Sequence, residues 1–137
     1  MKNKVKLFGI IVLMAVMFFG FVGIVSAQTA TSGTQAPVDY RGTWNCHCAR
    51  VTINESQLII VSSNDRVFTS DIISWRSVTN TGRLRRDFPT GVEFIVKCID
   101  TDETETMRFI LHRNKRQMCV DEYLDFDIWL EDALNKE

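Results

Sequence analysis

Residues 92–112, VEFIVKCIDTDETETMRFILH, decide the fold of this chain. Apolar side chains alternate with polar ones along both halves of the stretch, at Val92, Phe94, Val96 and Cys98 and then at Met107, Phe109 and Leu111. Because successive side chains of a strand point to opposite faces, this period of two predicts two half-buried strands. The acidic residues at 100–103 supply the turn, so the two strands are expected to form an antiparallel hairpin.

The same texture extends over residues 40–120, where short β-branched and aromatic runs are separated by turn residues. Poor alternation at residues 71–73 predicts a β-bulge. The pattern is typical of an all-β protein whose single antiparallel meander closes into a small barrel, over residues 40–137. The predicted strands are residues 42–53, 57–62, 66–78, 92–99, 104–112 and 116–120. In the first of them Trp44, Cys46 and Cys48 fall on one face, which is expected to point inward.

Residues 121–134 carry two competing patterns. Leu124, Phe126 and Ile128 alternate as in a strand, whereas Phe126, Leu130 and Leu134 fall on one helical face. Asp121 and the glutamate after it would suit the positive N-terminal end of a helix dipole. A short C-terminal helix over residues 121–134 is therefore expected.

Residues 1–27 have the three parts of a secretory signal peptide. Three lysines precede an uncharged apolar run at residues 7–24, and Val25-Ser26-Ala27 offers small residues for cleavage. An uncleaved membrane anchor is the rival interpretation, because the run approaches the ~20 residues that span a bilayer. Cleavage is favoured, so a periplasmic or secreted protein with no membrane span after cleavage is expected. Residues 28–39, rich in Thr, Ser, Gly and Pro, are expected to form a flexible leader ahead of the β domain.

The four cysteines are Cys46, Cys48, Cys98 and Cys119. An even number in an exported chain predicts two disulfides. Residues two apart in an extended strand lie close to the upper distance limit for a disulfide, so a Cys46–Cys48 bridge is the least favoured of the three pairings. Each of the two is expected to bond to one of the distant cysteines, and either bridge would contribute about 4 kcal/mol in the chain-entropy model.

No residue set supports catalysis or a resident cofactor. Cys46, His47 and Cys48 are zinc-ligand types, but a strand would point His47 away from both cysteines, and disulfides are favoured over a metal site. The two histidines, His47 and His112, lie in no hydrolase or thiol-protease signature. The net charge of −1 would become about −4 without the three lysines of the signal peptide, which argues against a nucleic-acid partner. A non-enzyme without metal or cofactor is expected.

The segment Tyr40-Arg41-Gly42-Thr43-Trp44 resembles the opening of the lipocalin-like (calycin) families. In those families a Gly-x-Trp begins the first strand and its Trp closes one end of an up-and-down barrel. The resemblance implies a late arginine against this Trp, for which Arg108 and Arg113 are candidates. It also implies either a lipocalin-type binding barrel or the compact inhibitor barrels, which share the motif.

Binding is therefore the expected role. In the first hypothesis a small hydrophobic ligand occupies the barrel, although plain core packing is the simpler role for the Trp of the motif. In the second, a solid barrel binds an extracytoplasmic protein, such as a protease, through its loops and leader. A structural envelope protein without a ligand is the third. The ligand-lining candidates are Trp44, Trp75, Phe94, Met107 and Phe109.

Overall fold

The structure is a computed structural model that describes residues 31–137. The predicted signal peptide and residues 28–30 of the predicted leader lie outside the described residues. No helix within residues 31–137 has the length and apolar character that crossing a membrane requires. The elements in chain order are β1 (Ser32–Gly33), η1 (Val38–Tyr40), β2 (Gly42–Asn45), β3 (Ala49–Ile53), β4 (Gln57–Ser62), β5 (Val67–Thr79), β6 (Thr90–Cys98), β7 (Thr104–Leu111), β8 (Gln117–Val120), η2 (Leu130–Asp132) and β9 (Leu134–Lys136).

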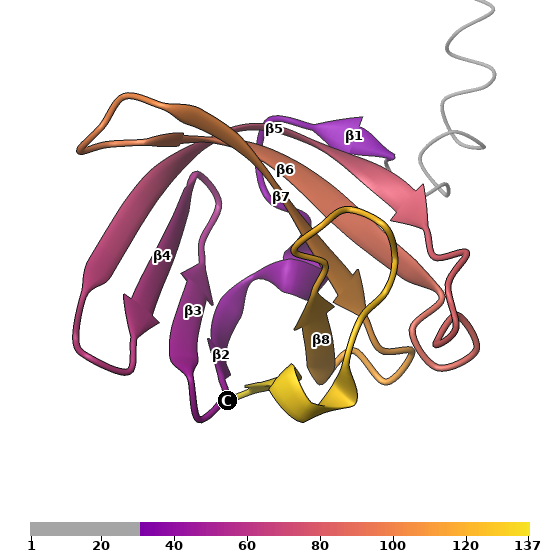
Figure 1. Cartoon of the computed structure of the whole chain (residues 1–137). Helices are drawn as coiled ribbons and strands as arrows, with labels where there is room; N and C mark the ends of the chain where they lie inside the picture. Colours follow the sequence, from indigo (N-terminus) through magenta and orange to yellow (C-terminus); the bar gives the residue numbers. More distant parts are fainter. Residues whose placement is uncertain (1–30) are drawn as a thin grey trace, which may run out of the picture. The chain divides into compact units, whose positions relative to one another are not determined.

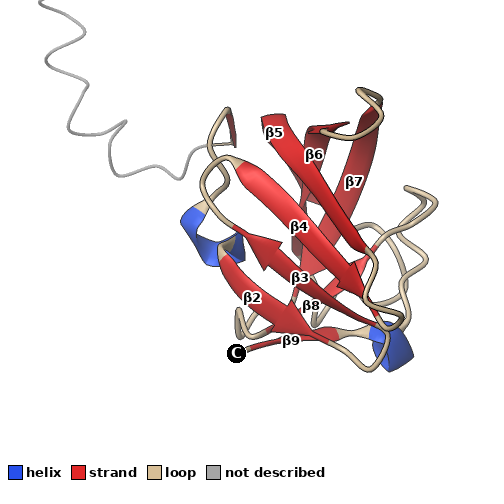
Figure 2. Cartoon of the chain, turned by 90° about the vertical axis from the view of Figure 1, so that its left-hand side faces the viewer, coloured by secondary structure: helices blue, strands red, loops and turns tan. Residues whose placement is uncertain are grey.

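Strands β2 to β9 form a closed antiparallel barrel (Figures 1 and 2). Each strand pairs with the next one along the chain, and β9 pairs with β2 to close the ring. Closure leaves no barrel strand without a neighbour, which removes the exposed edges that promote aggregation. The predicted all-β meander and its closure into a barrel are confirmed.

The predicted strands agree with the structure except at the first. Residues 42–53 form two strands, β2 and β3, joined by a tight hairpin at residues 46–48 rather than one long strand. The bulge predicted at residues 71–73 is confirmed, because the register between β5 and β6 shifts between Ile72 and Ser74. On its other side, β5 pairs with β4 as far as Asp71 and with β1 at Trp75 and Arg76.

The predicted C-terminal helix is wrong. Residues 121–133 form an irregular strap, with only the 3-10 turn η2, and Leu134 already belongs to β9. Leu124 and Phe126 have φ values of 58° and 63°, which a right-handed helix does not allow. The carboxylate of Asp121 instead accepts hydrogen bonds from the backbone N–H groups of Asp125 and Phe126. These local bonds offer the chain an alternative to a helix.

The leader also differs from its prediction over its described part. Residues 31–39, expected to be flexible, lie against the barrel: β1 pairs with β5, and Ala36 is fully buried. The indole N–H of Trp75 donates to the carbonyl of Gln35. Composition missed this attachment because one small apolar side chain and a few backbone groups provide it.

A large apolar cluster fills most of the barrel interior. Trp44 is 0% exposed, and its indole N–H donates to the carbonyl of Tyr40 at 2.9 Å. Its inward position, predicted from the strand pattern, is confirmed. Gly42, two residues earlier, has a φ of 125°, a conformation that side chains rarely allow, and this explains the glycine of the motif. Trp44 and Tyr40 together fill one end of the barrel.

A second cluster lies outside the barrel, beneath the strap. Ile110 of β7 and Cys119 of β8 pack there with Phe88 and Ile128, and all four are buried. Arg83, from the loop before β6, donates to the carbonyl of Ile128 at 3.2 Å. The strap and this loop therefore cover the outer face of β7 and β8 together.

A buried ionic cluster holds the strap to the barrel wall. Arg108 forms ion pairs with Glu93 and with Asp121, and each of the three side chains is less than 10% exposed. Arg76, which is largely exposed, forms a second ion pair with Glu93 at 3.0 Å. Burial opposes ionisation of Glu93, but the hydrogen bonds from Arg108 and Arg76 outweigh it and hold the pKa of Glu93 below its ordinary value. The Arg108 guanidinium also lies over the ring of Phe126, 4.2 Å from its centroid.

Candidate functional site

The end of the barrel opposite Trp44 and Tyr40 is hollow. A cavity of about 410 Å³ opens there, within the range of about 300–1,000 Å³ typical of small-molecule sites. Its lining is mainly apolar and comes from the β2–β3 hairpin, β3, β4, β7, β8, β9 and the strap. We call it the mouth cavity, lined by Cys46, Cys48, Ala49, Val51, Ile60, Met107, Phe109, Val120, Glu122, Asp132 and Leu134.

The mouth cavity has a buried floor and a solvent-exposed rim. Val51, Phe109 and Leu134 are buried and form the floor, whereas Glu122 and Asp132 are exposed. Among residues 31–137, no lysine or arginine lines the cavity. The site therefore offers an apolar interior and a rim that carries two negative charges.

All five predicted ligand-lining residues belong to the interior cluster, but only two reach the mouth cavity. Trp75, Phe94 and Met107 are successive partners across β5, β6 and β7, so their side chains lie in one row. Met107 and Phe109 line the cavity. The other three residues, Trp44, Trp75 and Phe94, are packed in the core and do not line the cavity.

The remaining lining residues escaped the sequence analysis. Val51 and Ile60 fall on alternating positions and could have been found by extending the strand pattern to β3 and β4. Leu134 gave no strand signal, because the strand that carries it has three residues, and its spacing from Leu130 was assigned to the expected helix. Glu122 and Asp132 lie on the strap, whose path the helical interpretation misplaced.

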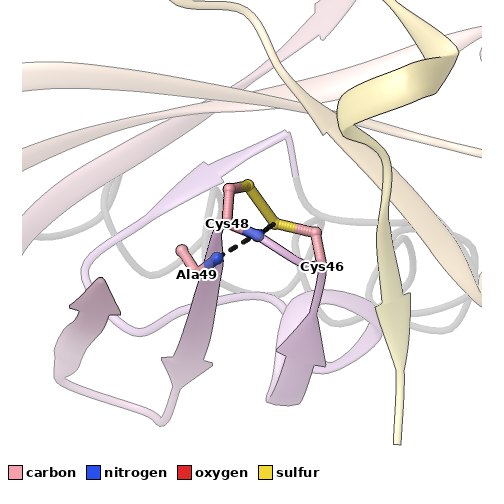
Figure 3. Close-up of a disulfide and its surroundings, with 3 residues drawn as sticks. All are labelled: Cys46, Cys48 and Ala49. Carbon is pink, nitrogen blue, oxygen red and sulfur yellow. Dashed lines mark hydrogen bonds between the residues drawn. A yellow bond between two sulfur atoms is a disulfide. The ribbon is translucent and has the colours of Figure 1, made fainter. Parts of the chain in front are cut away.

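Cys46 and Cys48, at this rim, form a disulfide, the pairing that was least expected. Figure 3 shows the bond and its surroundings. The prediction assumed an extended strand, whereas residues 46–48 form the turn of the β2–β3 hairpin. The turn brings the two Cα atoms to 5.3 Å, well within the range for a disulfide. Cys98 and Cys119 are free, so the predicted long-range bridges are wrong.

The two free thiols have opposite environments. Hydrogen bonds from Thr101, and then from the backbone of Asp100, hold the pKa of Cys98 below its ordinary value. Burial, followed by the charge of Asp132, raises the pKa of Cys119 to about 11. Since the thiolate is the reactive form, the two cysteines should differ in reactivity.

We expect iodoacetamide at neutral pH to alkylate Cys98 at least tenfold faster than Cys119 in the folded protein. Peptide mapping by mass spectrometry after timed quenching measures both rates in one sample. In urea the two rates should converge, because unfolding removes both environments. Equal rates in the folded protein would contradict the difference.

The closed end of the barrel departs from the lipocalin-like resemblance in one respect. The cation over the Trp44 ring is Lys136, whose Nζ lies 5.1 Å from the ring centroid. Neither arginine proposed for this place occupies it: Arg108 lies in the buried ionic cluster, and Arg113 donates to the carbonyl of Arg86. The closing strand β9 brings Lys136 there by pairing it with Trp44.

The two histidines lie apart from each other and from the cavity floor. His47 is exposed at the β2–β3 hairpin, whereas His112 packs edge-on against the ring of Phe88, with centroids 4.9 Å apart. Within the described part of the chain, no group of three or more His, Cys, Asp or Glu side chains is placed to hold a metal ion. The arrangement therefore consists of an apolar cavity with a disulfide at its rim.

No family model matches the chain, and neither a curated protein nor a solved structure matches it. The antiparallel barrel is consistent with a lipocalin-like barrel, and the resemblance rests on this architecture alone.

Proposed function

We propose that the protein is an exported, non-catalytic binding protein that holds a small hydrophobic ligand in the mouth cavity of a lipocalin-like barrel. The observation that carries this proposal is the asymmetry of the barrel. One end is filled by Trp44 and Tyr40, whereas the other is an open apolar hollow of about 410 Å³. A periplasmic or secreted location is supported by the signal-like first 27 residues and agrees with a disulfide, which persists in oxidising compartments.

The charge of the rim favours a particular class of ligand. Glu122 and Asp132 border the opening, and no lysine or arginine of the described part of the chain lines it. A carboxylate head group would be repelled there, whereas a neutral or positively charged one would be tolerated or attracted. The preferred ligand is therefore an apolar molecule with a neutral or cationic head group.

The test is isothermal titration calorimetry. The protein, in the form in which it is isolated from the cells that produce it, is titrated with decyltrimethylammonium, decanol and decanoate. We expect the affinity to fall from the ammonium compound to decanol and again from decanol to decanoate. Each step should be about three- to tenfold, since exposed charge pairs contribute about 1 kcal/mol or less. The double variant E122Q/D132N should remove the difference between the ammonium compound and the alcohol. Failure of all three compounds to bind would remove the ligand hypothesis.

Filling the cavity should abolish this binding. Val120 lines the cavity at its rim and is partly exposed, so V120W adds volume at little cost to the core. We expect at least a tenfold loss of affinity for decyltrimethylammonium with an unchanged Tm. The matched control is I73W, because Ile73 of β5 is similarly exposed but outside the cavity. Equal losses in both variants would place the ligand elsewhere.

A second candidate is a barrel that binds an extracytoplasmic protein through its surface. The strap exposes four large apolar side chains, Tyr123, Leu124, Trp129 and Leu130. The leader is a weaker candidate for this contact, because residues 31–39 are docked on the barrel. The cavity variant separates the two functions, since V120W leaves the exposed side chains of the strap unchanged.

A further inference from the structure

The Cys46–Cys48 disulfide is open to attack from solvent. It lies at the turn of the β2–β3 hairpin (Figure 3). His47 and Cys48 are exposed there, and Cys46 is half-buried. Both cysteines also line the rim of the mouth cavity, so a thiol in solution can approach them from the open end of the barrel. A disulfide that only stabilises a fold is more often shielded from such reagents.

The fold does not depend on this bridge. A ring that encloses a single intervening residue restricts the unfolded chain far less than a long loop would. The hairpin is also held by its backbone, since the N–H of Cys46 donates to the carbonyl of Ala49 at 2.9 Å and Asn45 pairs with Arg50. The bridge can therefore open while β2 and β3 stay paired.

The two sulfur atoms are not equivalent. Sγ of Cys46 accepts the backbone N–H groups of Cys48 and Ala49, at 3.3 and 3.2 Å (Figure 3 draws these three residues). Two N–H donors stabilise negative charge on the sulfur that receives them, which makes Cys46 the better leaving thiolate. Cys48 is the more exposed of the two and is the sulfur that an incoming thiolate reaches.

We propose that Cys46–Cys48 is a redox-active disulfide at the mouth of the barrel, which exchanges with small thiols. A thiolate attacks Sγ of Cys48, the Cys46–Cys48 bond breaks, and Cys46 leaves with the electron pair as a thiolate. A second thiolate attacks the outer sulfur of the mixed disulfide, which releases Cys48 and an oxidised small disulfide. Two electrons pass from two thiols to the protein, and the released thiolates take protons from water. Oxidation by a small disulfide reverses both steps.

The experiment is equilibration of the native protein in buffers of reduced and oxidised glutathione, followed by acid quenching, alkylation and peptide mapping. We expect Cys46 and Cys48 to become half-reduced within the range that glutathione covers, while circular dichroism stays that of the folded barrel. A shielded structural disulfide resists this pool. A pair that stays oxidised throughout, or that opens only when the barrel unfolds, would overturn the proposal.

Two sets of variants test the assigned roles of the sulfurs. A49P removes one N–H donor to Cys46 at the first residue of a strand, where proline is tolerated, and should slow reduction about tenfold. In single variants, the Cys46 thiol left by C48S should alkylate with a lower pKa than the Cys48 thiol left by C46S. Unchanged rates in A49P together with equal or reversed thiol pKa values would refute the assignment of Cys46 as the leaving group.

Discussion

Replacing Arg108 with alanine is expected to lower the free energy of unfolding by about 3–5 kcal/mol, the usual cost of removing one partner of a buried ion pair. The substitution leaves the buried carboxylates of Glu93 and Asp121 without their shared cation. It also removes the guanidinium that lies over Phe126 of the strap. Urea unfolding followed by circular dichroism measures the loss.

Arg76 provides the matched control for this prediction, because it pairs with the same carboxylate from an exposed position. R76A should cost less than about 1 kcal/mol, as exposed pairs do. Similar losses in R108A and R76A would show that burial does not set the strength of this cluster.

The ionic cluster also predicts how stability changes in acid. The pKa of folded Glu93 lies below its ordinary value, so its contribution is fully present above the pKa of the unfolded chain, about 4.3. That contribution is lost as the pH falls from there through the lower, folded pKa. R108A should therefore lose less stability than the native chain between pH 5 and pH 3, as urea unfolding at each pH would show.

Trp44→Ala is expected to cost about 3–5 kcal/mol, the range for removing a large aromatic side chain from a core. Trp44 is 0% exposed, and the variant would leave the carbonyl of Tyr40 without the indole N–H. W44F, which keeps most of the volume, should cost about 1–3 kcal/mol, mainly for the unsatisfied carbonyl.

Trp129→Ala serves as the reference for this series. Trp129 is 54% exposed and contacts Arg83 through its ring, so the variant should lose less than about 1 kcal/mol. Thermal and urea unfolding of the three variants give the comparison. A loss in W44A no larger than that in W129A would mean that the closed end does not stabilise the barrel.

The barrel was predictable because its strands bury one face. Alternation identified β6 and β7 and placed Trp44 inside, and its failure near Ile72 located the bulge. These features depend on side-chain period alone. They are visible in the sequence because a strand with one buried face and one exposed face must alternate apolar and polar residues.

The errors share a different cause. The strap buries Ile128 and partly buries Phe126, and the spacing of its apolar residues suits a helix as well as the irregular path that the chain follows. Only the positive φ values and the hydrogen bonds to Asp121 distinguish the irregular path from a helix. Neither feature produces a periodic pattern of side chains in the sequence. The disulfide was mispaired for the same reason, because a turn at residues 46–48 replaces an assumed strand.

The candidate site was found in part. Met107 and Phe109 came from the strand pattern, but the cavity also depends on where β9 and the strap cross the open end. Those positions follow from pairings between distant segments, such as Met118 with Leu134. Local sequence patterns contain little information about such pairings.

The pairing of β2 with β9 has a consequence for how the barrel assembles. The ring closes only when Trp44 of β2 pairs with Lys136 of β9, and Lys136 lies near the C-terminal end of the folded domain. During synthesis from the N-terminus, β2 therefore presents an unpaired edge until almost all of the domain has been made. Closing such a long loop late makes folding slow and leaves a window for misassembly between nascent chains.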